Sequence, residues 1–68
     1  MARRWYRLTR TTLALFQEED GYVARPLEKD ERIEFDPDEL LKGLDLVEVL
    51  WQDELVLMFA ADLMSLIW

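Results

Sequence analysis

The amino-acid sequence predicts a mainly β fold, and three observations support that prediction. Asp20-Gly21 lies between two apolar runs, a pattern typical of the turn in a β-hairpin. Residues 32–36 alternate between polar and apolar side chains, as expected of a half-buried strand. The uninterrupted apolar run 55–59 follows the polar segment 52–54, so a second tight hairpin is expected there.

The first hairpin is expected over residues 11–25. The β-branched residues Thr11 and Thr12 favour the start of its first strand, and the glycine of the turn can adopt the positive φ that primed turns require. Pro26 cannot donate a hydrogen bond to a neighbouring strand, so it either ends the second strand or places it at a sheet edge. The charged segment 28–31 is then expected to form a second turn.

One short helical turn is expected near residues 37–42. Asp36 suits the N-cap and Pro37 suits the first helical position. Glu39 is placed to complete a capping box, and Gly43 suits the C-terminal end. The segment has room for only one or two turns, so it is interpreted as a connection between strands.

Residues 44–51 resume the character of a strand. Alternation places three side chains on one face, Val47, Val49 and Trp51. Leu44 and Leu46 have the opposite parity, so either a bulge or burial on both faces is expected.

The segment 54–66 allows two interpretations. As a strand, residues 55–59 pair with 47–51, and residues 60–63 turn the chain into a last short strand. As a helix capped by Asp53, the segment presents one apolar stripe at helical spacing, formed by Leu55, Met58, Phe59, Leu63 and Leu66. The helix would make the protein α+β, with a three- or four-stranded sheet and a C-terminal helix. The strand is preferred because of the family resemblance described below.

The size and composition of the chain favour one globular domain over residues 1–68. With 51% hydrophobic residues, the chain lacks the composition of a disordered protein. A domain this small cannot bury all of these side chains, so some apolar surface is expected to remain for a partner. The expected core consists of nine residues: Leu13, Leu15, Val23, Ile33, Phe35, Val47, Val49, Leu57 and Phe59.

The charge is negative and unevenly distributed. The first ten residues contain four arginines and no acid, which gives them a charge of +4. Because the net charge of the chain is −7, the remaining residues together carry −11. An acidic body repels phosphate, and we therefore expect no binding of nucleic acid. No apolar segment is long enough to span a bilayer or to serve as a signal peptide, so we expect a cytoplasmic protein that does not bind membranes.

Catalytic chemistry has little support in the sequence. The chain has no cysteine and no histidine, which removes the usual nucleophilic thiol, the usual general base and the thiolate metal sites. The acids at 18–20 are expected in a solvated turn, and helix capping accounts for Asp36 and its neighbours. We therefore predict that the protein is not an enzyme and uses no metal, no other cofactor and no small-molecule substrate.

The order of the expected elements resembles short bacterial proteins of the Src-homology-3 (SH3)-like barrel type. The resemblance depends on Tyr6-Arg7-Leu8, on residues 32–35, and on the segments 43–51 and 56–63. It implies a five-stranded small barrel covering nearly the whole chain. The tight hairpin of such barrels usually contains a glycine, which residues 52–54 lack.

We interpret the chain as a non-catalytic protein-interaction or assembly module that associates with itself or with a larger protein. The alternative is an acidic inhibitor or nucleic-acid mimic that occupies a basic site on a target protein. The nine strand residues already supply a core of suitable size, so the apolar residues near the two chain ends are predicted to bind the partner. These are Trp5, Leu63, Leu66, Ile67 and Trp68.

Overall fold

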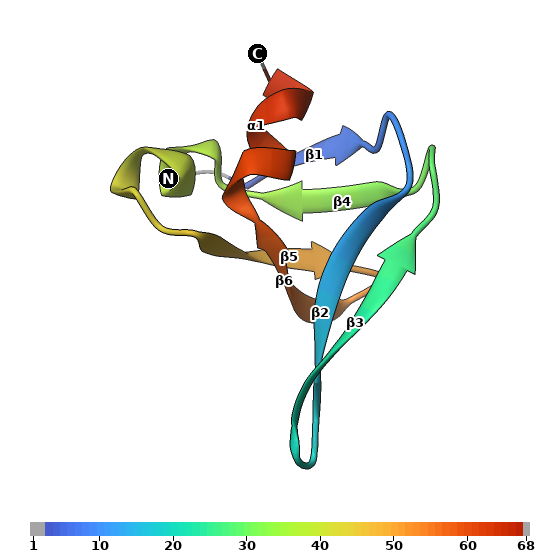
Figure 1. Cartoon of the computed structure of the whole chain (residues 1–68). Helices are drawn as coiled ribbons and strands as arrows, with labels where there is room; N and C mark the ends of the chain where they lie inside the picture. The colour runs from blue at the N-terminus through green and yellow to red at the C-terminus, as the bar shows by residue number, and fades with distance from the viewer. Residues whose placement is uncertain (1–2, 68) are drawn as a thin grey trace.

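The computed structural model describes residues 3–67, which form one six-stranded antiparallel sheet with a C-terminal helix (Figure 1). The elements in chain order are β1 (Arg4–Arg7), β2 (Thr12–Glu18), β3 (Gly21–Leu27), β4 (Arg32–Phe35), the 3-10 helix η1 (Pro37–Lys42), β5 (Leu46–Trp51), β6 (Glu54–Phe59) and α1 (Ala60–Ile67). The mainly β prediction is confirmed. The sheet has one strand more than the five expected.

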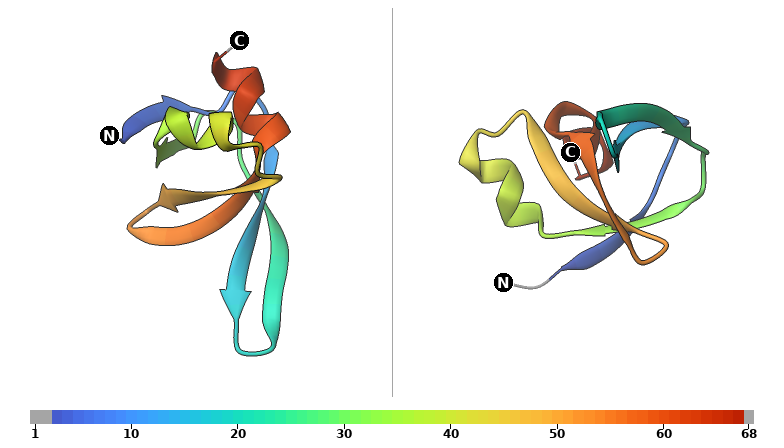
Figure 2. Two further views of the ribbon diagram at one scale, coloured as in Figure 1. Left: turned by 90° about the vertical axis from the view of Figure 1, so that its left-hand side faces the viewer. Right: turned by 90° about the horizontal axis from the view of Figure 1, so that it is seen from below.

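The strands lie in the order β1-β4-β5-β6-β2-β3, so β1 and β3 are the two edges of an open sheet. Figure 2 shows that the sheet is strongly curved. The β2–β3 hairpin extends away from the other strands, and α1 lies at the opposite end of the molecule (Figure 1). Neither helix within residues 3–67 is long and apolar enough to cross a membrane.

The predicted hairpin over residues 11–25 is confirmed as β2 and β3. Glu18 pairs with Gly21, so the two loop residues are Glu19 and Asp20. Gly21 has a φ of 131°, a conformation that side chains with a Cβ rarely adopt. Pro26 lies within β3, and its missing N–H is tolerated because β3 is an edge strand.

The tight hairpin between β5 and β6 is also confirmed, and it forms without a glycine. Trp51 pairs with Glu54, which leaves Gln52 and Asp53 as the two turn residues. Both have positive φ, 49° and 63°, as a primed turn requires. Residues other than glycine are destabilised in this left-handed conformation, so Gln52 and Asp53 lower the stability of the turn.

The helical turn at 37–42 forms as predicted, with 3-10 geometry. The Asp38 N–H donates to the Asp36 side chain over 2.9 Å, and Pro37 begins the helix. Gly43 ends it with a φ of 74°. The capping box is wrong in one respect, because the Glu39 carboxylate accepts a hydrogen bond from the Lys42 amine at 2.7 Å.

The strand interpretation of the C-terminal segment is confirmed only as far as Phe59. The expected turn at 60–63 and the short strand after it are wrong, because residues 60–67 form α1. The helical alternative placed the helix start too early, since Asp53 lies in a turn and the chain is extended from 54 to 59. Alanine, leucine and methionine, which favour a helix, make up five of the eight residues of α1, and the segment contains no glycine or proline.

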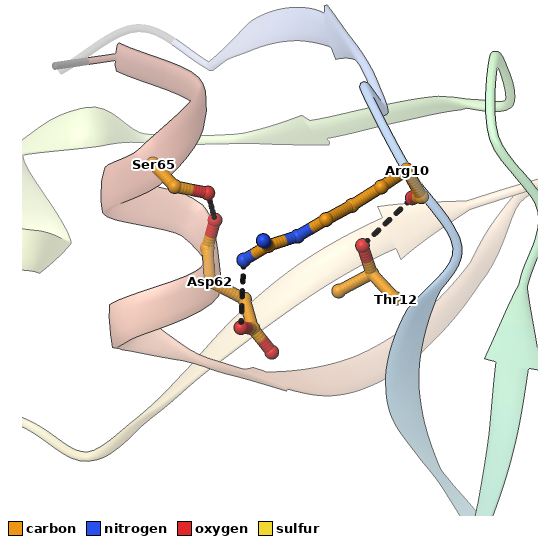
Figure 3. A network of polar contacts seen from close by, with 4 residues as sticks. All are labelled: Arg10, Thr12, Asp62 and Ser65. Atoms are coloured by element: carbon orange, nitrogen blue, oxygen red, sulfur yellow. Dashed lines mark hydrogen bonds and ion pairs between the residues drawn. The ribbon is translucent and has the colours of Figure 1, made fainter.

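Polar contacts connect α1 to the segment between β1 and β2 (Figure 3). The guanidinium of Arg10 lies 3.8 Å from the carboxylate of Asp62. Thr12 donates to the Arg10 carbonyl over 2.9 Å, and Ser65 donates to the Asp62 carbonyl over 2.6 Å. The Ala60 N–H, donating to the carbonyl of Asp45 at 2.8 Å, fixes the start of the helix.

The core lies on the inner face of the sheet and beneath α1. Its buried residues are Leu8, Ala14, Phe16, Leu27, Ile33, Phe35, Leu40, Val47, Val49, Val56, Met58, Ala60 and Leu63. Four of the nine residues expected in the core are therefore buried, all of them in β4 and β5.

The expected core is wrong in β2, β3 and β6. In β2 and β6 the inward and outward faces were assigned the wrong way round, whereas Val23 of β3 lies opposite the buried Phe16 but remains exposed. Leu13, Val23 and Phe59 are between 41% and 48% exposed. Leu15 and Leu57 are half-buried. Side chains alternate along a strand, so an error of one residue moves every side chain to the other face. In β2 and β6 both faces are apolar, and the sequence therefore cannot choose between them.

Candidate functional site

The residues predicted to bind a partner do not form one surface. Trp5 is 55% exposed on β1, with the Arg32 guanidinium 4.5 Å from its ring centroid. Leu63 is completely buried in the core, which corrects its assignment to an interface. Leu66 and Ile67 are partly buried and pack against that core. The prediction for Trp68 lies outside the described residues.

A different surface is apolar, on the outward face of β3, β2, β6 and β5. Twelve side chains of these strands point outward, opposite in parity to the buried residues of the same strands. Ten of them are apolar: Leu13, Leu15, Tyr22, Ala24, Pro26, Leu46, Leu50, Leu55, Leu57 and Phe59. We call these ten residues the outer apolar face. The other two outward side chains are Gln17 and Glu48.

The strand register brings these side chains side by side. Leu15 of β2 lies opposite Leu57 of β6, and Leu50 of β5 lies opposite Leu55. Directly opposed side chains on one face of a sheet are in contact range of one another. The outer apolar face is therefore continuous across all four strands.

Much of this face is open to solvent. Leu13 is 48% exposed, Tyr22 56%, Leu55 52% and Phe59 41%. Phe59 also lines a shallow depression with Leu44 and Met64, which extends the apolar surface towards α1. Six of the nine exposed large hydrophobic residues within positions 3–67 lie on or beside the outer apolar face. This clustering distinguishes it from scattered exposed side chains, which need no explanation.

The sequence of β6 shows why this face is unusual. Every residue from Leu55 to Phe59 is apolar, which is the pattern of a strand buried on both of its faces. Val56 and Met58 fill the inner core, whereas Leu55 and Phe59 face outward and are exposed. The strand thus has the composition of a two-sided interior but only one covered side.

Other places in the structure offer less chemistry. The indole N–H of Trp51 donates to the Glu31 carboxylate over 2.7 Å, and this pair lines a depression with Glu34 and Asp53. Within residues 3–67 no three potential metal ligands come together. Thr12 is the one buried polar residue in the described part of the chain, and its hydroxyl is hydrogen-bonded.

The pKa of the Lys42 side chain is raised by its surroundings. The hydrogen bond and charge of Glu39 raise the pKa of the exposed Lys42 amine above its usual 10.5. This surface pair stabilises the end of η1. It has no geometry that suggests catalysis.

Sequence reasoning missed the outer apolar face because it assigned a single buried face to every strand except the one at 44–51. The available signal was the unbroken apolar composition of 13–16 and 55–59, which indicates strands with two apolar faces. Compared with known proteins, the chain matches no protein-family model, no curated protein and no solved structure.

Proposed function

We propose that this chain is a non-catalytic protein-interaction module that binds its partner through the outer apolar face. The observation that carries the proposal is the β6 strand, which is apolar on both faces and covered on only one. Exposed apolar patches of this kind commonly mark interaction sites. The partner is either another copy of the chain or a larger protein.

The energetics are adequate for association. Fully burying a large apolar side chain contributes about 1.5–3 kcal/mol. Leu13, Tyr22, Leu55 and Phe59 are each roughly half exposed. Completing their burial would therefore contribute about 3–6 kcal/mol, before the partner's own apolar surface is counted and before the entropic cost of association.

The size of the face is also suitable. A standard protein interface buries about 800 Å² on each partner. The described structure has 4861 Å² of accessible surface, so such an interface would cover about one-sixth of it. The outer apolar face spans four neighbouring strands of the six-stranded sheet.

We further propose an SH3-like small barrel, supported by the order of hairpin, alternating strand, 3-10 turn and tight hairpin. The absence of catalytic activity is supported by the lack of histidine and cysteine and by the absence of buried acids within residues 3–67. The acidic-mimic alternative has less support. Three acids that would imitate phosphates are already in ion pairs, namely Glu18 with Arg25, Glu39 with Lys42, and Asp62 with Arg10.

Size-exclusion chromatography of an extract from cells expressing the chain tests this proposal. We expect the wild-type chain to elute in a complex, and the Leu55→Asp variant to elute as the free chain. Leu41→Asp is the matched control, because Leu41 is 74% exposed on η1 and lies off the face. The proposal fails if the wild-type chain elutes free, or if both variants remain in the complex.

A further inference from the structure

We infer that the occupant of the outer apolar face is a segment of another protein that combines apolar side chains with a lysine or arginine, and that this cation pairs with Glu48. The inference depends on the proposed function, because it names the partner class for the same surface. It is carried by the position and charge of one side chain.

Glu48 is the one charged side chain among the twelve that point outward from β3, β2, β6 and β5. It lies opposite Leu57 of β6 and between Leu46 and Leu50 along β5. Glu48 is exposed and forms no ion pair within residues 3–67. Arg3 lines one neighbouring depression together with Glu48 but makes no ion pair with it.

Covering the face would remove water from this carboxylate. A carboxylate that loses its water without gaining a cation or hydrogen-bond donors is strongly destabilised. A lysine or arginine removes that penalty through a charge-assisted hydrogen bond. The aliphatic stems of these two side chains can at the same time lie along the leucines that surround Glu48.

The charges around the face favour the same kind of partner. Glu34 of β4 lies opposite Leu50, Asp45 lines the depression beside Phe59, and Glu19 and Asp20 lie at the hairpin tip next to Tyr22. Arg3 and Arg32 line the depressions beside Leu50, where acidic side chains outnumber them. Beyond the first ten residues the chain carries −11. Such a field accelerates encounters with basic partners and slows encounters with acidic ones.

Other occupants fit these charges less well. A second copy that presents the same face would bring Glu48 against Glu48, and it would bring together two chains of −7 each. Nucleic acids and anionic membrane surfaces carry the same sign of charge as Glu48. A basic and apolar protein segment is the class that complements both the leucines and the carboxylate.

Selection of a random 16-residue peptide library displayed on phage against the full chain tests this inference. We expect the enriched peptides to combine apolar residues with lysine or arginine. Their affinity should fall about tenfold or more in Glu48→Gln. It should also fall in Leu55→Asp, which places a charge on the outer apolar face. The matched controls are Glu28→Gln and Leu41→Asp, two exposed positions outside the face that should leave affinity unchanged.

A charge reversal keeps the test independent of folding defects. Selection against Glu48→Lys should enrich peptides with aspartate or glutamate in place of lysine or arginine, because the preferred charge follows position 48. Circular dichroism of every variant shows whether it is folded. A gain of acidic binders cannot arise from unfolding alone.

The outcomes separate the partner class from the proposed function. The inference is wrong if the enriched peptides show no preference for basic residues and bind Glu48→Gln as well as the wild-type chain. The proposed interaction module would still stand in that case if binding depends on Leu55. A dimer in light scattering that dissociates in Leu55→Asp would replace the basic partner with a second copy. The inference is also wrong if no peptides are enriched, or if the peptides bind Leu55→Asp as well as the wild-type chain. Elution of the wild-type chain as a free protein from the cell extract would overturn the proposed function itself.

Discussion

Replacing Leu63 by alanine should destabilise the protein strongly, whereas the same change at Met64 should have little effect. Leu63 is completely buried where α1 packs on the core, and its neighbour Met64 is 38% exposed. Removing a fully buried leucine costs about 2–5 kcal/mol through lost burial and the cavity left behind. At about 0.05–0.15 kcal/mol per residue, this 68-residue chain has about 3–10 kcal/mol of stability in total. Leu63→Ala therefore removes a large part of it.

Met64→Ala is the matched control because the two residues are adjacent in the same helix. Alanine has a slightly higher helix propensity than leucine or methionine, so neither change weakens the helix backbone. Met64→Ala is expected to cost about 1 kcal/mol or less, because the Met64 side chain is only partly buried and its removal exposes little apolar surface.

Urea unfolding followed by circular dichroism measures both variants. Comparison of the midpoints at equal denaturant slope gives the change in the free energy of unfolding. Equal costs for the two variants, or a larger cost for Met64→Ala, would refute the packing of α1 and return Leu63 to the surface.

Three further outcomes follow from the described residues. Leu55→Asp should leave the chain folded, whereas Val56→Asp, one position further along β6, should unfold it, because Leu55 is 52% exposed and Val56 only 2%. Thermal melts of both variants measure this difference, and two similar melts would contradict the assignment of the faces. Replacing Gln52-Asp53 by Asn-Gly should raise the unfolding free energy by about 1 kcal/mol, since both turn positions have positive φ; no gain in a urea titration would argue against the primed turn. Glu39→Gln should lower the pKa of Lys42 towards 10.5 in an NMR titration. Because the pKa of Lys42 is raised in the folded state, its contribution to stability is complete below pH 10.5 and is lost as the pH rises through the raised value.

The turns and caps were the part of the fold that local sequence could predict. Asp36, Pro37 and Gly43 define η1 through their own backbone preferences, without help from the rest of the chain. The Asp20-Gly21 pair likewise located the β2–β3 hairpin, although its loop residues are shifted by one position. Such signals depend on neighbouring residues only, and they are therefore readable in sequence.

The C-terminal helix could not be separated from a strand by local rules. Residues 54–59 and 60–67 are both rich in leucine and other apolar side chains, with no loop residues between them. What ends the strand at Phe59 is tertiary packing, in which Ala60 and Leu63 turn onto the core. A boundary set by long-range contacts leaves little trace in the local pattern.

The candidate surface was predicted in kind but not in place. Composition correctly indicated exposed apolar surface, but the assignment of Leu63 and its neighbours to that surface followed from a misassigned core. Once Leu13 and Phe59 are known to face outward, the apolar surplus lies on the sheet. Period-two alternation chooses a face only where the other face is polar, as at Ile33 and Phe35 of β4.

Site-specific photo-crosslinking in cells that express the chain tests the role of the outer apolar face most directly. A photoreactive amino acid would replace Leu55 or Leu13 on the face in separate variants, and Leu41 on η1 as the control. We predict a defined adduct with a protein from positions 55 and 13 and none from position 41. Adducts of equal yield from all three positions, or adducts from position 41 alone, would contradict the assignment of this face as the site of interaction.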